Sequence, residues 1–219
     1  MIILYGNFIS IYVLRLSSCQ ASITNFAEGC VIEFMKKMYV HMEPQSTLDE
    51  LKAACRRAAE AQCAAICVPQ WFVAPAAEEL KDTDLEVLTI VGLPGGTTSS
   101  FAKYAEAKQA VANGADEVIV PMNLELCVKD PGAAKNDFVA SAAPAKKHGR
   151  VLTLVDAAAL TEEQAVAAAE IGIAGGADLA LIANATGHLM QTLEEKKIPA
   201  GTFGKTVAEP AAVCATTEL

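Results

Sequence analysis

Aromatic residues are scarce in this chain: they make up 5% of its 219 residues, while hydrophobic residues as a whole make up 53%. The core must therefore be built from Ala, Val, Leu and Ile, a mixture that suits helices packed closely on a parallel sheet. A chain of this length has the right size for a single α/β domain.

Clusters of basic residues are also missing, and the formal net charge is -9. Nucleic acids and anionic membrane surfaces are bound by grouped Lys and Arg side chains that displace counterions. We therefore expect neither a nucleic-acid nor a membrane partner. The sequence leaves a homo-oligomer open.

The motifs of metal sites and disulfide frameworks are absent. The seven cysteines are odd in number and form no C-x-x-C pair, and no two of His41, His148 and His188 lie within a helical turn of each other. This pattern predicts reduced thiols in a cytoplasmic protein, with no metal site.

Residues 1–34 differ in composition from the rest and are treated as an N-terminal extension. The segment IILYGNFISIYVLRL is apolar, but it lacks a basic n-region and is too short to span a bilayer. Two interpretations explain this difference in composition. The segment is a secretion signal, or the given sequence starts upstream of the true translation start at Met35 or Met38. The fold is therefore argued for residues 35–219.

From about residue 39, short apolar runs alternate with longer helical patterns, which is typical of repeated βα units. Capping boxes are predicted where Thr47 precedes Glu50 and where Thr161 precedes Gln164. The predicted strands cover residues 38–42, 64–68, 86–91, 116–122, 150–155, 178–184 and 203–207.

Glycines predict where two of these helices end. Gly114 and Gly176 each precede Ala-Asp and a strand, where a left-handed residue would terminate a helix. A doubly wound sheet would need G-x-G-x-x-G after its first strand, and this chain has no such run. The pattern therefore favours a barrel.

Three stretches, residues 63–80, 87–120 and 149–182, together resemble the deoxyribose-phosphate aldolase family in order and spacing. The likeness covers roughly residues 46–187. It implies an α/β fold of the (β/α)8 TIM-barrel type. It also implies a class I aldolase, in which a lysine forms a Schiff base and 2-deoxyribose 5-phosphate is cleaved to glyceraldehyde 3-phosphate and acetaldehyde. Such an enzyme requires no metal and no organic cofactor.

The charged positions that the resemblance implies are apolar in this chain. Ile119 stands where the family has an Asp, Leu152 where it has a Lys, and Leu181 where it has the Schiff-base Lys. If the alignment is shifted so that Thr186-Gly187 matches the family's closing Thr-Gly, Ala183 takes the position of the Schiff-base lysine instead of Leu181. We expect Ile119 and Leu181 to point into the barrel near its C-terminal end.

Other family positions are matched. Cys67 and Lys205 are the catalytic candidates, and Thr186 with Gly187 matches the family's closing Thr-Gly, a substrate-binding pair. Each catalytic candidate has an alternative. Cys67 also fits a small buried side chain, and Lys205 also fits a solvated lysine of the C-terminal tail.

No eighth strand follows Lys205, so the barrel is expected to be incomplete at its C-terminal end. Deletion of the last unit, a frameshifted tail and replacement by the N-terminal segment are all open. The family's phosphate-binding Gly-Gly is replaced by Ala208-Glu209, and a glutamate would repel a phosphate.

Two kinds of function follow. One is an aldolase homologue with reduced or absent activity, or one that uses a relocated lysine on a small phosphorylated sugar. The other is a catalytically silent homologue that binds a metabolite or a partner protein. A degraded relative with no function of its own is the third alternative.

Overall fold

The computed structural model describes residues 38–43 and 45–203, in which seven strands form one sheet. The strands lie side by side in chain order, and every neighbouring pair is parallel. They are β1 (Met38–Val40), β2 (Ala65–Cys67), β3 (Glu86–Ile90), β4 (Glu117–Pro121), β5 (Arg150–Asp156), β6 (Leu179–Ala183) and β7 (Ala200–Phe203).

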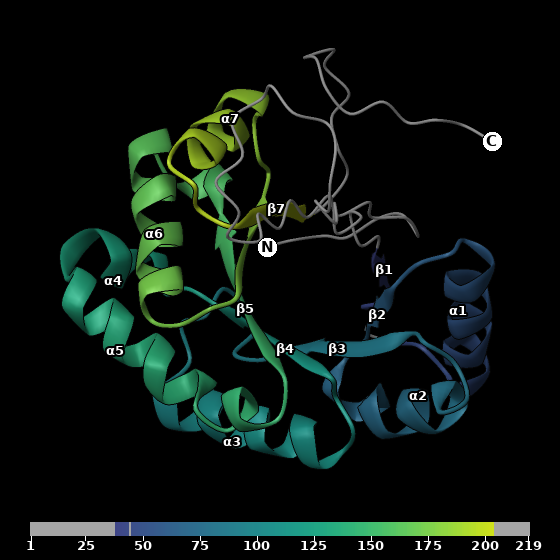
Figure 1. Ribbon diagram of the computed structural model, residues 1–219. Coiled ribbons are helices and arrows are strands. Elements are labelled where there is room, and N and C mark those ends of the chain that lie inside the picture. Colours follow the sequence, from purple (N-terminus) through teal and green to yellow (C-terminus); the bar gives the residue numbers. More distant parts are fainter. Residues whose placement is uncertain (1–37, 44, 204–219) are drawn as a thin grey trace, which may run out of the picture.

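At least one helix separates each strand from the next, and Figure 1 shows the helices on the outside of a sheet that curls into an incomplete barrel. Among the described helices, none has the length and hydropathy needed to cross a bilayer. The α-helices are α1 (Leu48–Glu60), α2 (Val73–Leu80), α3 (Ser100–Ala112), α4 (Leu124–Lys129), α5 (Pro131–Ala142), α6 (Glu162–Ala174) and α7 (Gly187–Glu195). Short 3-10 turns are η1 (Gln70–Phe72), η2 (Ala145–Lys147) and η3 (Ala157–Ala159).

Successive residues of each strand belong to different hydrophobic clusters, as the two-residue period of a strand requires. In β6, Ala180 and Ile182 pack with helix residues, whereas their neighbours pack only with residues of other strands. We call this second, helix-free group the interior cluster. It comprises Met38, Val40, Ala65, Cys67, Leu88, Ile90, Ile119, Leu152, Leu154, Leu179, Leu181, Ala183 and Phe203.

The strands predicted between residues 64 and 184 are confirmed to within two residues at either end. The seventh strand was placed wrongly, because β7 begins at Ala200 and only Phe203 of the predicted range 203–207 lies within the described residues. Ala and Gly open this strand, and both are weak strand formers, so the apolar pattern did not show it. The sheet is of the predicted barrel type, and β1 and β7 each have one neighbour among the described strands.

The predicted helix ends are confirmed. Thr47 and Thr161 form complete capping boxes at the starts of α1 and α6. Gly114 follows the end of α3 with φ +94°, and Gly176 follows the end of α6 with φ +96°. Both values lie in the left-handed region that glycine adopts without a steric penalty.

The aspartates that follow these glycines anchor the sheet, a role that the sequence did not reveal. Asp116 Oδ2 accepts a hydrogen bond of 2.8 Å from the backbone N–H of Val87 in β3. Asp178 Oδ2 accepts one of 2.9 Å from the backbone N–H of Val151 in β5. Each carboxylate therefore ties the start of its own strand to the start of the preceding one.

The contact between α6 and β5 is tight enough to test with one methyl group. A Cβ added at Gly172 would lie 2.6 Å from Thr153 Cγ2, while one added at Gly187, also helical, would meet nothing within 4 Å. We expect Gly172→Ala to lower the free energy of unfolding by about 1–3 kcal/mol, as overpacking does. Urea denaturation measures this, and Gly187→Ala is the control that should lose no stability. A Gly172→Ala protein as stable as the wild type would contradict the packing.

Candidate functional site

Three interior positions are those at which the resemblance implies charged catalytic groups. Ile119, Leu152 and Leu181 are 0%, 4% and 1% exposed and belong to the interior cluster. Ile119 pairs with Leu152 across β4 and β5, and Leu181 pairs with Leu154 across β5 and β6. The prediction that Ile119 and Leu181 point into the barrel is confirmed. Each lies at the middle of its strand, deeper than the C-terminal end that we expected.

The middle of the interior is apolar, and charged residues in phase with it, such as Glu117, Arg150 and Asp156, stand only at the ends of the strands. None of the seven described strands contains a lysine. Phe203, the last residue of β7, is 4% exposed and pairs with Ala183 of β6. The sequence pattern had not identified Phe203 as an inward-facing residue. Within the described strands, therefore, no amine is available to form an imine with a carbonyl inside the barrel.

Cys67 lies in the interior cluster and is fully buried. Burial raises the pKa of its thiol to about 12, because the thiolate would lose its hydration there. The thiol is therefore neutral near pH 7, and a neutral thiol is a poor nucleophile. Of the two interpretations weighed for Cys67, this position favours packing.

The remaining candidate residues are Thr186, Gly187 and Lys205. Thr186 precedes α7, and its hydroxyl accepts a hydrogen bond of 3.1 Å from the backbone N–H of Leu189. Gly187 is the first residue of α7 and has open space beside it. The two lie where β6 ends, at the rim formed by the carboxyl ends of the strands, which we call the C-terminal rim. Lys205 lies outside the described residues.

A carboxylate and an amide meet at the C-terminal rim between β5 and β6. Asp156 ends β5 two residues after Leu154, so strand alternation turns its side chain toward the interior. Asn184 follows β6 directly, and its Nδ2 donates a hydrogen bond of 2.7 Å to Asp156 Oδ1. Asn184 has φ +54°, a left-handed conformation that Asn tolerates better than most residues. The sequence analysis did not single out this pair.

A histidine and a carboxylate meet at the starts of α7 and α6, the helices that follow β6 and β5. His188 Nδ1 lies 2.6 Å from Glu162 Oε1, and the Thr192 hydroxyl donates to the same oxygen at 3.2 Å. The His188 side chain is 78% exposed, so water competes for this contact. Within residues 38–43 and 45–203, no three His, Cys, Asp or Glu side chains gather closely enough to hold a metal ion.

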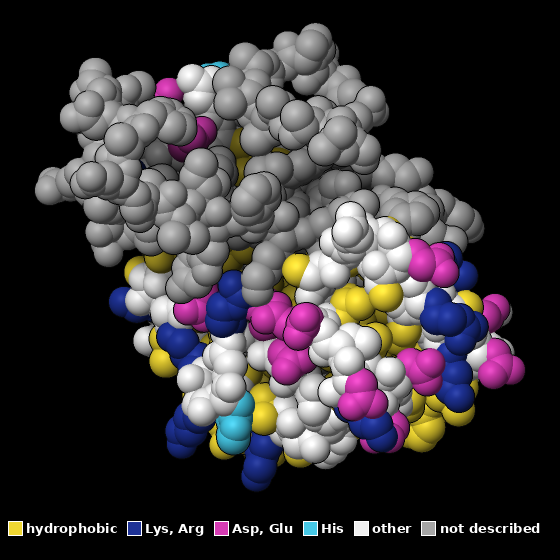
Figure 2. All heavy atoms as spheres, turned by 45° about the vertical axis from the view of Figure 1, so that its right-hand side comes forward, with side chains coloured by type: hydrophobic (Ala, Val, Ile, Leu, Met, Phe, Trp, Pro, Cys, Tyr) yellow, Lys and Arg dark blue, Asp and Glu magenta, His cyan; other side chains and the backbone are white. Residues whose placement is uncertain are grey.

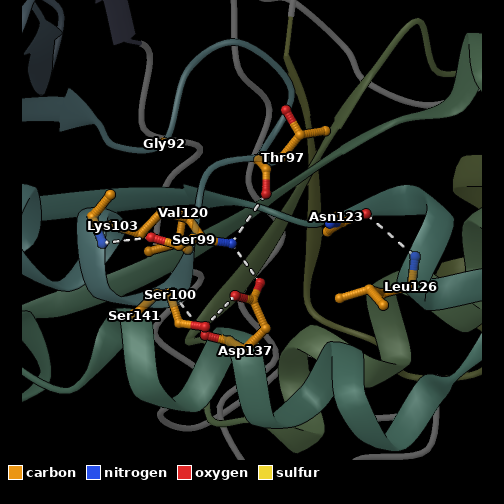
Figure 3. A network of polar contacts seen from close by, with 12 residues as sticks. Gly92, Thr97, Ser99, Ser100, Lys103, Val120, Asn123, Leu126, Asp137 and Ser141 are labelled. Carbon is orange, nitrogen blue, oxygen red and sulfur yellow. Dashed lines mark hydrogen bonds and ion pairs between the residues drawn. The ribbon is translucent and has the colours of Figure 1, made fainter.

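The loop after β3 is held from the helix side by a buried lysine. Ser99 caps α3 by accepting a hydrogen bond from Ala102 N. Lys103 is fully buried, forms an ion pair with Asp137 of α5, and donates a hydrogen bond of 3.1 Å to the carbonyl of Gly96 (Figure 3). Its amine is therefore already paired and does not point into the barrel interior.

Charges also meet at the opposite, N-terminal end of the barrel. Arg150 forms an ion pair with Glu117, whose side chain is 4% exposed, and lies 3.6 Å from Glu86. A cavity of about 280 Å3 between α2 and the start of β3 opens at this end. In barrels of this type the N-terminal end contributes to stability and the C-terminal end carries the chemistry. The C-terminal rim, with Asp156, is therefore the candidate site.

Comparison with known proteins agrees with this geometry. Residues 30–180 match the sequence profile of the DeoC/LacD family aldolases. The chain is 31% identical over 167 residues to a deoxyribose-phosphate aldolase of Caldanaerobacter subterraneus, covering 74% of this chain and 72% of that protein. It is 32% identical over 168 residues to one of Streptococcus equi subsp. zooepidemicus, covering 77% of this chain and 75% of that protein.

Solved structures show the same type of fold. An aldolase named QR15 is 21% identical and superposes with a TM-score of 0.67, covering 74% of this chain and 76% of that chain. A protein of Coccidioides immitis assigned as a deoxyribose-phosphate aldolase is 26% identical, with a TM-score of 0.61. The match covers 65% of this chain and 56% of that chain. The deoxyribose phosphate aldolase of Aeropyrum pernix, described as tetrameric, is 17% identical, with a TM-score of 0.60, and 65% of this chain covers 60% of it.

Burial of the thiols predicts a loss of stability in alkali. Burial raises the pKa from its ordinary value of 9.0 to about 12 at Cys67 and to about 11 at Cys55 and Cys127. Above pH 9 the unfolded chain releases these protons while the folded chain keeps them, so stability present below pH 9 is lost as the pH rises.

Urea denaturation between pH 8 and pH 11 measures this effect, and Cys67→Ala separates it from the titration of other groups. The free energy of unfolding of the wild type should fall more steeply than that of Cys67→Ala, by ~1.4 kcal/mol per pH unit. Equal slopes would show that the Cys67 thiol is not held in a dry interior.

Proposed function

The chain belongs to the DeoC/LacD family of aldolases, and we propose that it keeps the family's barrel without forming a Schiff base on β6. Cleavage of 2-deoxyribose 5-phosphate is then reduced or absent. The observation that carries this proposal is the buried, apolar middle of the barrel interior, formed by Ile119, Leu152, Leu181 and the other members of the interior cluster.

The reaction attributed to the named relatives needs an amine and a proton relay. A lysine amine attacks the aldehyde carbon, water leaves, and the protonated imine accepts the electrons of the carbon–carbon bond that breaks. A carboxylate within hydrogen-bond reach moves the protons. At positions 119, 152 and 181 this chain offers methyl and methylene groups in place of both.

A silent binding protein is the second candidate, and the pair of Asp156 and Asn184 favours it. The two side chains stand at the C-terminal rim, where ligands bind in barrels of this kind. A carboxylate beside an amide suits the hydroxyl groups of a sugar, because hydroxyls both donate and accept hydrogen bonds. It does not suit a phosphate, which the carboxylate repels.

Self-association is part of the same proposal. The tetrameric description of the Aeropyrum pernix relative supports it. Trp71 and Phe101, at 83% and 80% exposure, are large apolar side chains that a second copy would cover. Sedimentation of the purified chain measures its oligomeric state.

A trapping experiment tests the proposal. Wild-type protein is incubated with 2-deoxyribose 5-phosphate and borohydride, and its intact mass is recorded beside that of the Streptococcus equi relative as the positive control. We expect an adduct on the relative and none on this chain, because no interior amine is available on the described strands. An adduct on this chain, mapped to one peptide, would refute the proposal and locate the nucleophile.

Activity assays of three proteins separate the remaining alternatives. The wild type, Lys205→Ala and Leu181→Lys should all cleave 2-deoxyribose 5-phosphate weakly or not at all. Leu181→Lys restores the amine, but Ile119 still lacks the carboxylate that relays the proton. Strong wild-type turnover that Lys205→Ala abolishes would instead establish Lys205 as a relocated nucleophile. Calorimetric binding of 2-deoxyribose, which lacks the phosphate, by a protein without turnover would support the silent binding protein.

A further inference from the structure

His41 is a buried histidine at the edge of the described sheet. It directly follows β1, and its backbone N–H donates a hydrogen bond of 2.8 Å to the carbonyl of Cys67, continuing the pairing of β1 with β2. Its side chain is 6% exposed. It follows Tyr39 by two residues, so strand alternation turns both side chains toward the helices. Buried histidines away from a catalytic site normally have their ring nitrogens satisfied.

The ring of His41 lacks one partner. Within the described part of the chain, no group forms a hydrogen bond with Nε2, although this atom is buried. A neutral imidazole tolerates this, because only one of its nitrogens must donate. An imidazolium donates from both nitrogens, so the charged form would leave a buried N–H without an acceptor and at a cost in free energy.

A second cation faces the same region from α1. Arg57 Nε donates a hydrogen bond of 3.0 Å to the Tyr39 hydroxyl, and its guanidinium lies 6.0 Å from the centre of the Tyr39 ring. This contact links α1 to β1. It also holds the positive charge of Arg57 on the helix-facing side of β1, the side toward which the His41 side chain points. If His41 took up a proton, two cations, His41 and Arg57, would lie between the short strand β1 and helix α1.

The charges around His41 do not cancel. Burial is the main cause that lowers its pKa from 6.5, and the Arg57 guanidinium acts in the same direction. Glu43 in the following loop and Glu50 of α1 oppose this and are the smaller effects. β2, the neighbouring strand, has no charged residue. The neutral form is therefore the one that the folded structure selects.

We propose that His41 is a pH-sensitive latch between the edge strand β1 and helix α1, and that its protonation loosens the contact between them. β1 is suited to this because it pairs with a single neighbour among the described strands and contributes three residues to the sheet. The latch is independent of any aldolase activity, since it uses no residue of the C-terminal rim between β5 and β6.

The direction of the effect follows from linkage. In the folded protein the pKa of His41 is lowered from 6.5, whereas in the opened segment it returns to about its ordinary value. Just below pH 6.5 the opened segment therefore takes up a proton while the folded protein keeps His41 neutral. The contact between β1 and α1 is therefore at full strength above pH 6.5 and weakens as the pH falls toward the lower value of the folded state. The opening equilibrium rises by up to about tenfold for each pH unit in that window.

Two measurements on the full chain test the latch. Hydrogen exchange read by mass spectrometry at pH 7.5 and pH 5.0, corrected for the intrinsic rate, should show faster exchange in peptides from β1 and α1 and unchanged exchange in β4 to β6. His41→Gln should remove this difference, while His188→Gln, at an exposed histidine, should leave it as in the wild type. The chain has only three histidines, so nuclear magnetic resonance can also follow the His41 ring directly in the wild type.

Each outcome decides the proposal. A His41 ring that titrates below 6.5 together with local opening of β1 and α1 supports it. A ring that titrates at or above 6.5, or equal exchange of β1 and α1 at the two pH values, overturns it. If His41→Gln does not fold, the titration and the exchange of the wild type still give the answer.

Discussion

Both faces of the parallel sheet must be covered by apolar side chains, and the remaining architecture depends on this constraint. In β6 the inward residues, such as Leu181, and the outward residues, such as Ile182, are equally apolar. A slip of one residue would exchange the two faces with little change in hydrophobicity, so burial alone does not fix the register. The carboxylates of Asp116 and Asp178 do so, because each accepts the first backbone N–H of the neighbouring strand's apolar run.

The fold was largely readable from the sequence, for reasons that the structure makes plain. Strands buried on both faces have nearly continuous Val, Ile and Leu, and helices with capping boxes at Thr47 and Thr161 separate them. β7 departs from this rule: Ala200 and Gly201 open it, and its place is set by pairing with β6. Pairing between distant segments leaves no local pattern, which is why β7 and the inward position of Phe203 were missed.

The candidate site was also predictable only in part. The interior positions Ile119 and Leu181 were predicted because they align with a family motif and because strand alternation fixes their direction. The pair of Asp156 and Asn184 could not be predicted, since 28 residues separate its members and only the register of β5 with β6 brings them together. The available signal was a polar residue at the end of each apolar run. Such residues are common in loops and also serve as helix caps.

The charges that this fold does bury lie in pairs, and this bears on the apolar middle of the barrel interior. Lys103 is fully buried beside Asp137, and the buried Glu117 has Arg150, so each of these buried charges has a partner. Removing one member of such a pair leaves an uncompensated charge, which costs about 3–5 kcal/mol. A single charge introduced at position 119, 152 or 181 would lie among buried apolar side chains and would carry this cost, which Ile119, Leu152 and Leu181 avoid. Charged groups that are to do chemistry in the middle of this barrel must therefore be introduced together, because each alone would be buried without a partner.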